Sequence, residues 1–509
     1  FEEPSKKLAL AGDKIYVALQ NKIIPLNLND QVESATTISQ NNLTNAYFGN
    51  NSLWVSTVNN GLSVVKNNTL ETIDLNCPYS SSFSSIMIHS NGSLWATSSG
   101  FGENNNPYGF YRFSEGKWTN YNKSKNPELI SNAACSIAEG NDGSVFIGTY
   151  GGGLYNIKGD KITFYNSNNS SIIQAPGDNT NFIVITGIAK DLSGNLWFTN
   201  YKALNNNGLH ALSSTGSWKG YQNGINPSSN NFFRGLVVDE YGTKWIVSNY
   251  DPIYNGIFYF NDKYTLPGTV SGWGYLGVTD LGTSGGDTPI LCLAIDKNNE
   301  LWVGTESGVR VVGKISNPLA SISKPCVTTR CNISGQIINC IAVDPLNNKW
   351  VGTRATGIWV LSPDGSSVIT QLNTENSFLT DNNIKSITMD PKSGYVYVGT
   401  DRGLSSFKTF LVEPLPEFSE KLKIYPNPYD PEKGSLSIDG LIEASLIKVI
   451  TPYGKMIKSF QSPGGKVAYW DGKDDNNNFV SSGVYFVIGY SSDGKKNSIG
   501  KIAVVRAGK

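Results

Sequence analysis

A recurring unit constrains the fold of this chain more than any other feature of its sequence. One copy contains three short apolar segments separated by polar or glycine-containing turns: Ile290–Asp296, Leu301–Thr305 and Val309–Val312. The next copy repeats the same order with Ile338–Asp344, Lys349–Thr353 and Gly357–Val360. Short apolar segments bounded by turn residues are typical of β-strands. Each copy therefore predicts a small antiparallel sheet.

The second segment of each copy carries an aromatic residue that marks the period. These residues lie about 40 to 57 positions apart, as expected for repeated small sheets, and are Tyr16, Trp54, Trp95, Phe146, Trp197, Trp245, Trp302, Trp350 and Tyr397. Such a sheet has two apolar faces that it cannot bury alone, so successive sheets stack around an axis as blades. The sequence predicts a β-propeller, in which Gly304, Gly352 and Gly399 occupy crowded positions near the axis.

The number of copies indicates more than one propeller, because single rings have about four to eight blades. We expect a ring of about seven blades over residues 46–410, with residues 1–45 forming a partial blade of a second propeller whose remainder would precede Phe1. The alternative is one ring in which strands from both ends complete a blade. The Pro-rich residues 411–420 indicate a linker. Short strands and turn clusters over 421–509 predict a small Ig-like β-sandwich, so the fold class is all-β.

Composition excludes several function classes. The chain has 41 basic and 41 acidic residues and no basic block with interleaved aromatics, so nothing favours nucleic acid as a partner. No apolar run approaches the roughly 20 residues that span a bilayer. The opening Phe-Glu-Glu-Pro lacks a basic and then apolar leader, which suggests a processed or truncated start.

The residues available for catalysis are few. Two histidines, His89 and His210, leave little material for a Ser-His-Asp triad or a histidine-rich metal site. Aspartates recur directly before the turn into the aromatic segment, where the side chain caps backbone amides; they are Asp191, Asp239, Asp296, Asp344 and Asp390. We therefore expect no catalytic residue, no metal site and no cofactor.

Two weaker predictions concern binding and covalent structure. The aromatics Trp218, Tyr221, Trp273 and Tyr275 could stack on sugars, although such residues in a propeller often pack between blades. Cys326 and Cys331 lie in a polar insertion, where a loop-closing disulfide is plausible in an oxidising compartment. The other repeat cysteines, Cys135, Cys292 and Cys340, are expected to be buried small apolar residues.

The last module carries the most specific motifs of the chain. They are Lys423-Ile-Tyr-Pro-Asn-Pro428, Ile450-Thr-Pro-Tyr-Gly-Lys455, Trp470-Asp-Gly-Lys-Asp-Asp475 and Val480-Ser-Ser-Gly-Val-Tyr-Phe486. In order and spacing they resemble the C-terminal sorting domains of Bacteroidetes type IX secretion. The residues that carry this resemblance are Tyr425, Pro426, Asn427, Pro428, Gly454, Trp470, Asp471, Gly472, Gly483 and Tyr485.

The blades resemble propeller repeats of periplasmic sensor proteins of the same phylum, and the combination resembles surface components of the type IX attachment complex. That resemblance implies an exported, outer-membrane-associated protein with a retained C-terminal domain. Its partners would be a PorV-like barrel shuttle, a PorU-like sortase and a PorQ-like subunit. It would assist linkage of anionic lipopolysaccharide to cargo by binding lipopolysaccharide, without being an enzyme.

Two other functions stay open. The chain could be secreted cargo that acts on or binds polysaccharide, with a cleavable sorting domain; two carboxylates facing each other in the central funnel would favour this. It could also be the ligand-sensing ectodomain of a two-component receptor. A transmembrane helix should then follow the propeller, and the sequence shows none.

Overall fold

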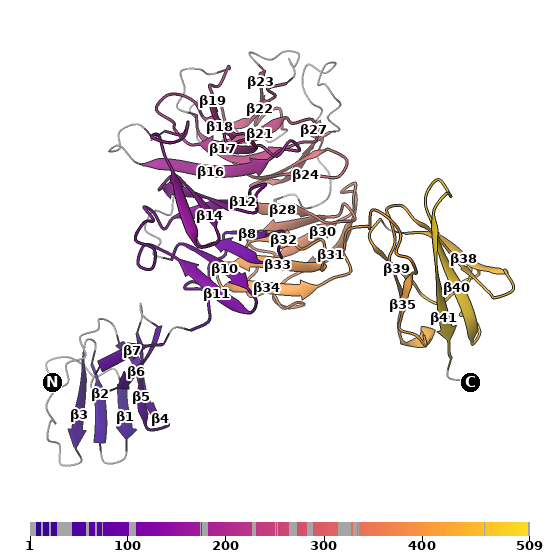
Figure 1. Ribbon diagram of the computed structural model, residues 1–509, viewed down its shortest axis with the longest axis horizontal. Coiled ribbons are helices and arrows are strands. Elements are labelled where there is room, and N and C mark those ends of the chain that lie inside the picture. Colours follow the sequence, from indigo (N-terminus) through magenta and orange to yellow (C-terminus); the bar gives the residue numbers. More distant parts are fainter. Residues whose placement is uncertain are drawn as a thin grey trace. The chain divides into compact units, whose positions relative to one another are not determined.

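The computed structural model of the chain consists almost entirely of β-strands (Figure 1), which confirms the all-β class. The one helical turn in the part of the chain that the structure describes is the 3-10 helix η1, Pro431–Lys433. Two compact units are distinguished, Phe1–Cys77 and Pro78–Lys509. The described residues are 7–11, 14–19, 22–27, 43–57, 61–66, 69–73, 75–100, 108–173, 175, 182–225, 231–249, 251, 253–263, 272–281, 289–313, 327–328, 333, 335–462 and 464–506.

The first unit contains two antiparallel sheets. One is formed in chain order by β1 (Lys7–Ala11), β2 (Lys14–Ala18) and β3 (Ile23–Asn27), and the other by β4 (Leu43–Gly49), β5 (Ser52–Thr57), β6 (Gly61–Lys66) and β7 (Thr69–Thr72). Strand β1 lies against β4, and Ala9, Ala18, Leu43 and Leu53 belong to one buried cluster shared by both sheets. The unit is therefore a pair of stacked blades.

The second unit begins with seven further blades among the residues that the structure describes. Blade one contains β8 (Ser85–Ile88), β9 (Leu94–Thr97), β10 (Phe110–Ser114) and β11 (Lys117–Tyr121); blade two β12 (Ala134–Glu139), β13 (Val145–Gly151), β14 (Leu154–Lys158) and β15 (Lys161–Tyr165); blade three β16 (Ile183–Lys190), β17 (Leu196–Asn200), β18 (Leu209–Leu212) and β19 (Trp218–Tyr221). Blade four contains β20 (Phe233–Val238), β21 (Lys244–Ser248), β22 (Gly256–Phe260) and β23 (Trp273–Gly277); blade five β24 (Ile290–Ile295), β25 (Leu301–Thr305), β26 (Gly308–Val312) and β27 (Val327–Thr328); blade six β28 (Ile338–Val343), β29 (Lys349–Thr353), β30 (Ile358–Leu361) and β31 (Val368–Leu372); blade seven β32 (Ile384–Met389), β33 (Tyr395–Thr400) and β34 (Gly403–Lys408).

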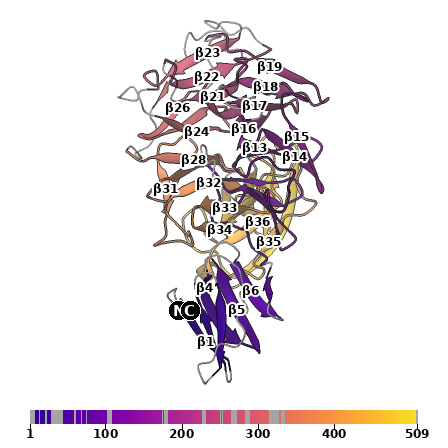
Figure 2. The same ribbon diagram turned by 90° about the vertical axis from the view of Figure 1, so that its left-hand side faces the viewer.

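These seven blades form a closed ring. The first strands contact one another in the order β8, β12, β16, β20, β24, β28 and β32, and β32 returns to β8. Figures 1 and 2 show β24, β28 and β32 as neighbours from two directions. A short pairing of β13 with β16 also joins blades two and three into one eight-stranded sheet. The predicted propeller of about seven blades is confirmed.

The sequence of the second strand follows from this arrangement. Both faces of a blade are covered by its neighbours, so a second strand reads as a continuous apolar run rather than as an alternating one. Every residue of β25, from Leu301 to Thr305, is accordingly buried, as is every residue of β29. The closing Thr305 and Thr353 accept backbone hydrogen bonds from Ser307 and Thr356 and thereby shape the following turn.

A belt of hydrogen bonds between blades closes the ring at one end of the first strands. In blades two to seven the first strand carries a β-bulge near its start, which interrupts the sheet ladder there. A carbonyl at this level of each blade accepts a bond from the preceding blade. The bonds are Ser99 N to Ala134 O (3.3 Å), Ser136 Oγ to Ile185 O (3.3 Å), Thr186 Oγ1 to Phe233 O (3.1 Å), Asn249 Nδ2 to Ile290 O (2.6 Å), Cys292 Sγ to Ile338 O (3.9 Å), Asn339 Nδ2 to Ile384 O (2.9 Å) and Ser386 Oγ to Phe83 O (2.9 Å).

Glycine is required in the second strand where the next blade approaches most closely. A Cβ at Gly352 would lie 2.5 Å from Cys340 Sγ and 2.7 Å from Ile384 Cγ2 of the next blade. Gly304 has the equivalent surroundings in blade five. The crowded position predicted from the repeat is therefore confirmed, and the crowding comes both from the cysteine of the adjacent first strand and from the apolar residue at the neighbouring bulge.

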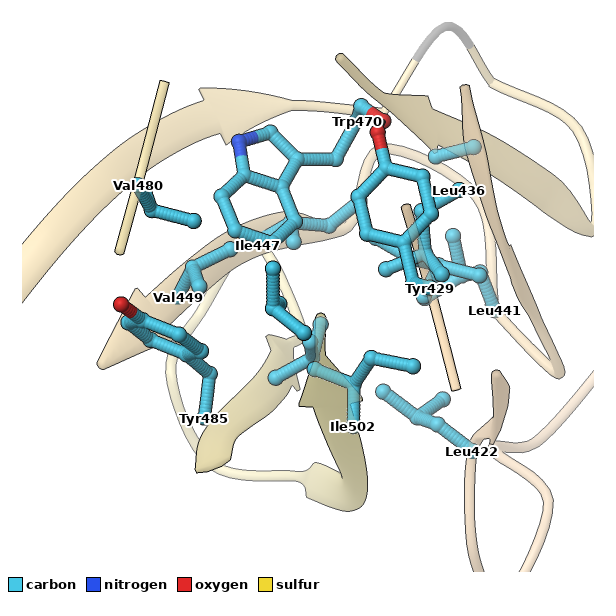
Figure 3. Close-up of a cluster of buried hydrophobic side chains, with 14 residues drawn as sticks. Leu422, Tyr429, Leu436, Leu441, Ile447, Val449, Trp470, Val480, Tyr485 and Ile502 are labelled. Carbon is cyan, nitrogen blue, oxygen red and sulfur yellow. Dashed lines mark hydrogen bonds between the residues drawn. The ribbon is translucent and has the colours of Figure 1, made fainter. Parts of the chain in front are cut away.

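The chain ends in a module of two packed sheets. One contains β35 (Lys423–Tyr425), β36 (Leu436–Asp439) and β39 (Val467–Trp470), and the other β38 (Met456–Gln461), β37 (Leu446–Ile450), β40 (Gly483–Tyr490) and β41 (Asn497–Val504). Leu436 and Trp470 of the first sheet and Ile447 and Ile502 of the second belong to one buried cluster (Figure 3). Burying each such side chain contributes about 1.5–3 kcal/mol. The two sheets therefore share a hydrophobic core of their own.

The start of the ring differs from the expected one. The expected boundary between residues 45 and 46 falls inside β4, and residues 43–72 form the second blade of the first unit, which ends at Cys77. The repeat signal is the same for every blade, so the period alone does not show which neighbour a blade packs against. The alternative of a blade completed by both chain ends is not formed, because among the described residues the sheet of blade seven contains β32 to β34.

We predict that Gly352→Ala destabilises the protein by about 1–3 kcal/mol, because the new methyl group overpacks the interface between blades six and seven. Gly235→Ala is the matched control, since its Cβ would meet Val247 Cγ2 at 3.4 Å, an ordinary contact. Urea unfolding of both variants measures the difference. Equal unfolding midpoints for Gly352→Ala and the unmodified chain would contradict the assigned crowding.

Candidate functional site

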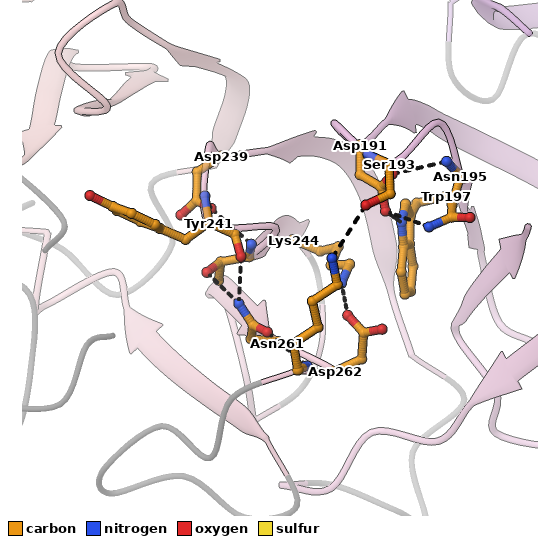
Figure 4. Close-up of polar contacts among 11 residues, drawn as sticks. Asp191, Ser193, Asn195, Trp197, Asp239, Tyr241, Lys244, Asn261 and Asp262 are labelled. Atoms are coloured by element: carbon orange, nitrogen blue, oxygen red, sulfur yellow. Dashed lines mark hydrogen bonds and ion pairs between the residues drawn. The ribbon is translucent and has the colours of Figure 1, made fainter. Parts of the chain in front are cut away.

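The recurring aspartates organise the turn between the first and second strands. Asp239 accepts hydrogen bonds from the backbone N–H groups of Tyr241 (3.0 Å) and Thr243 (2.8 Å), and from Trp245 Nε1 (3.0 Å). Asp191 holds its turn in the same way (Figure 4). The indole bonds in this series are Trp197 to Asp191 (3.0 Å), Trp245 to Asp239 (3.0 Å), Trp302 to Asp296 (3.3 Å) and Trp350 to Asp344 (3.1 Å).

This geometry confirms that the aspartates are structural. In blade seven the aromatic is Tyr397, which has no indole N–H, and Asp390 caps the turn through Lys392 N (3.0 Å). Each carboxylate in the series is thus directed at its own turn rather than at a second carboxylate across the ring. An acid–base pair of the kind that glycosidases use needs two carboxylates facing one substrate bond, and these five residues do not provide one.

Two buried lysines link neighbouring blades through the same turns. Lys349 Nζ lies 2.8 Å from Asp296 Oδ2 of the preceding blade, and both side chains are fully buried; the ammonium is also 4.6 Å from the centre of the Trp302 ring. Lys244 forms an ion pair with Asp262 and lies 3.7 Å from the centre of the Trp197 ring (Figure 4). Burial lowers the pKa of both lysines against the opposing effect of their carboxylate partners.

Both histidines are committed to local structure. His210 is fully buried, and its Nε2 lies 2.8 Å from the Asn207 carbonyl oxygen, so Nε2 carries the proton and donates. Its Nδ1 accepts from Ser171 Oγ at 2.8 Å. Burial lowers the pKa of His210 to about 4, so the ring is neutral at pH 7. His89 lies in blade one, with Nε2 2.9 Å from Gly143 O and Nδ1 accepting from Asn91 N at 3.1 Å.

One further string fits a nucleophile pattern. Gly282-Thr-Ser-Gly-Gly286 matches Gly-x-Ser-x-Gly, a pattern that requires a strand-to-helix turn and a histidine base. The string lies outside the described residues.

The four aromatics considered for sugar stacking pack against other aromatic rings of the ring of blades. Trp273 is 1% exposed and stacks on Phe260 at 4.6 Å between ring centres, which corrects the expectation of an exposed ring. The other three are half-buried: Trp218 packs on Phe198, Tyr221 on Trp197 and Tyr275 on Phe258. Two of them also contact rings of a neighbouring blade, Trp218 with Tyr165 and Tyr221 with Phe260.

The motif residues of the last module divide into a core set and a surface set. Trp470 is buried, and its Nε1 donates to Lys473 O at 2.8 Å; Tyr485 is buried, and its hydroxyl donates to Ser481 O at 2.8 Å. Gly472 has a φ of 74°, and a Cβ there would lie 2.6 Å from Pro431 Cβ. These three residues therefore specify the packing of the module.

The remaining motif residues lie at its edges and turns. Asn427 donates through Nδ2 to Lys501 O and accepts through Oδ1 from Ala503 N, both at 3.2 Å, so the segment Tyr425–Pro428 runs beside β41. Tyr425 itself is exposed. Asp471 Oδ1 caps Lys473 N (3.0 Å), Gly454 adopts a φ of 81° in the β37–β38 turn, and Gly483 begins β40.

Three of the repeat cysteines are free thiols in the structure. Cys292 and Cys340 face Gly304 and Gly352 across the first two strands as free thiols, and burial raises the pKa of both. Cys135 is also free, but it stands one position earlier in its strand, and Ser136 faces the glycine. The predicted disulfide between Cys326 and Cys331 lies outside the described residues.

The described residues contain neither a candidate metal site nor a candidate membrane-spanning helix. No group of three or more His, Cys, Asp or Glu side chains there could hold a metal ion. No helix in the same part of the chain is long and apolar enough to cross a membrane.

Comparison with known proteins finds a short family-model match and a similar solved structure. Residues 284–307 match the family model of the two component regulator propeller. The solved structure of PorZ, an essential bacterial surface component of the type-IX secretion system of Porphyromonas gingivalis, superposes with a TM-score of 0.71 at 26% identity, over 98% of this chain and 70% of that chain. The sequence has no significant match among curated proteins.

Two extracellular domains from B. thetaiotaomicron are more distant neighbours. One belongs to a protein described as a hybrid two component system, with a TM-score of 0.49, 15% identity, and coverage of 98% of this chain and 68% of that chain. The other belongs to a protein described as a one component system, with a TM-score of 0.48, 18% identity, and coverage of 99% and 76%.

We predict that Lys349→Met destabilises the protein by about 3 kcal/mol, because it leaves Asp296 as a buried charge without its cation. Thermal or urea unfolding measures the loss. The double variant Lys349→Met/Asp296→Asn removes both charges and should be more stable than the sum of the two single changes. Additive losses would show that the two buried groups do not interact.

Stability should also fall in mild acid because of His210. Its pKa is about 4 in the folded chain and about 6.5 when unfolded, so the unfolded state binds the proton more tightly. The contribution of neutral His210 is complete above pH 6.5 and is lost as the pH falls toward 4, with a loss of about 2 kcal/mol at pH 5. Unfolding midpoints at pH 7.5, 6 and 5 test this. A His210→Gln variant should lose that part of the pH dependence, and an unchanged pH profile in the variant would contradict the assignment.

Proposed function

We propose, from the premise that this chain is a PorZ-like protein, that it is a non-catalytic cell-surface component of a type IX secretion system. The observation that carries the proposal is the superposition on PorZ over 98% of the chain at a TM-score of 0.71. That match spans the blades and the two-sheet module together, so it supports a shared role rather than a shared repeat alone.

The finer role follows from the motifs of the last module. Sorting-type residues such as Trp470, Gly472 and Tyr485 form its core, which supports a folded recognition module. We propose that the chain assists sortase-dependent linkage of anionic lipopolysaccharide to cargo and binds that lipopolysaccharide. Its partners would be a PorV-like barrel shuttle, a PorU-like sortase and a PorQ-like subunit at the outer membrane.

A non-catalytic role agrees with the chemistry of the ring. The recurring carboxylates are directed at their own turns, and His210 is neutral and buried. General acid–base catalysis needs a titratable group that can reach a substrate. Within the described residues, the aspartate series and both histidines are used to hold the fold.

Purification from the native cells after crosslinking tests this proposal. We expect mass spectrometry to find the last module, residues 421–509, still joined to the blades, together with barrel and sortase subunits. A chain that ends near Phe418 and carries a new glycan would instead identify it as cargo with a cleaved sorting domain. A crosslinked barrel protein of the same membrane that is unrelated to secretion serves as the control for chance capture.

A further inference from the structure

We propose that blades two to four carry a binding site for an anionic saccharide at the end of the ring where the β-bulges lie, called here the bulge end. The site consists of Tyr150, Phe182, Tyr201, Lys202, Phe232 and Arg234. The proposal rests on the proposed function and names the surface that would contact the glycan.

The strand register brings these residues together. The bulge end is where each first strand begins and each second strand ends, as the pairing of Ile185 with Asn200 shows. Val184 at the start of β16 pairs with Tyr150 of blade two, and its carbonyl accepts from Tyr201 N at 2.9 Å. β13 and β16, which carry this link, lie side by side in Figure 2. Tyr150 and Tyr201 therefore flank one backbone position where blades two and three meet.

Four of the residues form two edge-to-face aromatic pairs on this surface. Tyr150 and Phe182 have ring centres 5.4 Å apart and planes at 82°, and Tyr201 and Phe232 have ring centres 5.7 Å apart and planes at 86°. All four side chains are half-buried, neither sealed in a blade interface nor fully exposed. Rigid, partly exposed aromatic rings offer contact area at low entropy cost, and the hydroxyls of the two tyrosines can add polar contacts.

Two cations lie over the same rings. Lys202 Nζ is 4.7 Å from the centre of the Phe232 ring and 5.6 Å from that of Tyr201, and the Arg234 guanidinium is 5.9 Å from the centre of the Tyr201 ring. Both side chains are half-buried. Arg234 occupies the bulge of β20, between Phe233 and Leu236, which directs it away from the sheet ladder.

The opposite side of the bulge end has a different character. Lys385 occupies the equivalent bulge in blade seven, and its Nζ lies 3.0 Å from Asp401 Oδ2. Arg402 Nε lies 3.4 Å from Asp381 Oδ2. Those cations are neutralised by carboxylates, whereas Lys202 forms no ion pair among the residues that the structure describes. Within that part of the chain, the Lys202 ammonium is therefore not neutralised by a carboxylate.

The backbone holds Lys202 in a conformation that long side chains rarely adopt. Its φ is 52°, and its N–H donates to Asn231 O at 2.8 Å. Asn231, with a φ of 49°, is itself tied through Nδ2 to Asn206 O at 2.8 Å. Such left-handed positions cost about 1–3 kcal/mol and persist where the surroundings fix them, often at binding sites. Here the paired turns hold the backbone of Lys202, whose ammonium lies 4.7 Å from the centre of the Phe232 ring.

This combination fits a saccharide that bears phosphate or carboxylate groups. Arginine and lysine bind such anions by charge-assisted hydrogen bonds, while aromatic rings contact the apolar faces of sugar rings. Sites of this kind place a few polar groups on a largely aromatic surface. The same chemistry is present in lipopolysaccharide and in the polysaccharide released from it, so both are used as probes.

Titration of the full chain tests the site. The probes are lipopolysaccharide purified from the organism that makes the chain and its delipidated polysaccharide. We expect Lys202→Met/Arg234→Met to weaken binding of both at least about tenfold, and to lower the salt dependence of binding. The matched control Lys385→Met/Arg402→Gln should change affinity by less than about twofold, because its cations are paired. Thermal unfolding of every variant verifies that it is folded.

The possible results distinguish failure of the proposed site from failure of the proposed function. Equal loss in both double variants, or no loss in the first, overturns the site while leaving the proposed function standing. Binding of intact lipopolysaccharide but not of the polysaccharide assigns recognition to lipid and also overturns the site. If the unmodified chain binds neither probe, both the site and the lipopolysaccharide role are overturned. Membership of the secretion complex is then tested by the crosslinking experiment alone.

Discussion

The ring depends on the close approach of neighbouring blades at the β-bulge. Each blade has two apolar faces, so burial of apolar surface requires a neighbour on each side. In blades two, five and six, a glycine of the second strand lies against the apolar side chain at the bulge of the next blade, and the carbonyl of that residue accepts an inter-blade hydrogen bond. One local irregularity, repeated in six blades, thus provides hydrogen bonds, close packing and closure of the ring.

Buried polar groups fix the turns between the first and second strands, at the end of the ring away from the bulges. A carboxylate such as Asp344 satisfies the turn amides and the Trp350 indole at once, so a large aromatic can be buried without leaving its N–H unpaired. Lys349 extends this arrangement across a blade interface. With the ring held by these groups, the bulge end is free to differ from blade to blade, and the aromatic and cationic residues of blades two to four lie there.

Much of this architecture could be predicted from the sequence, because the order of strands recurs in each blade, and the aspartate and the glycine recur in several of them. The positions of Gly352 and Asp344 followed from that pattern. The grouping of blades did not, since β4 and β8 begin equivalent units and only packing shows that one belongs to the first unit. The candidate site was missed for a related reason. Tyr201 and Lys202 lie in the irregular residues after β17, Arg234 lies at the bulge of β20, and their meeting depends on the strand register. Trp273, in contrast, was visible in sequence but is buried by blade packing.

The most direct test of the central account is the fate of cargo in cells that lack this chain. The account predicts that cargo proteins are then released without an attached glycan instead of being anchored at the surface. Re-expression of the full chain should restore anchoring. Normal glycan attachment and surface anchoring of cargo in the deletion strain, measured by mass spectrometry of cell-surface and medium fractions, would contradict the assignment to the attachment machinery.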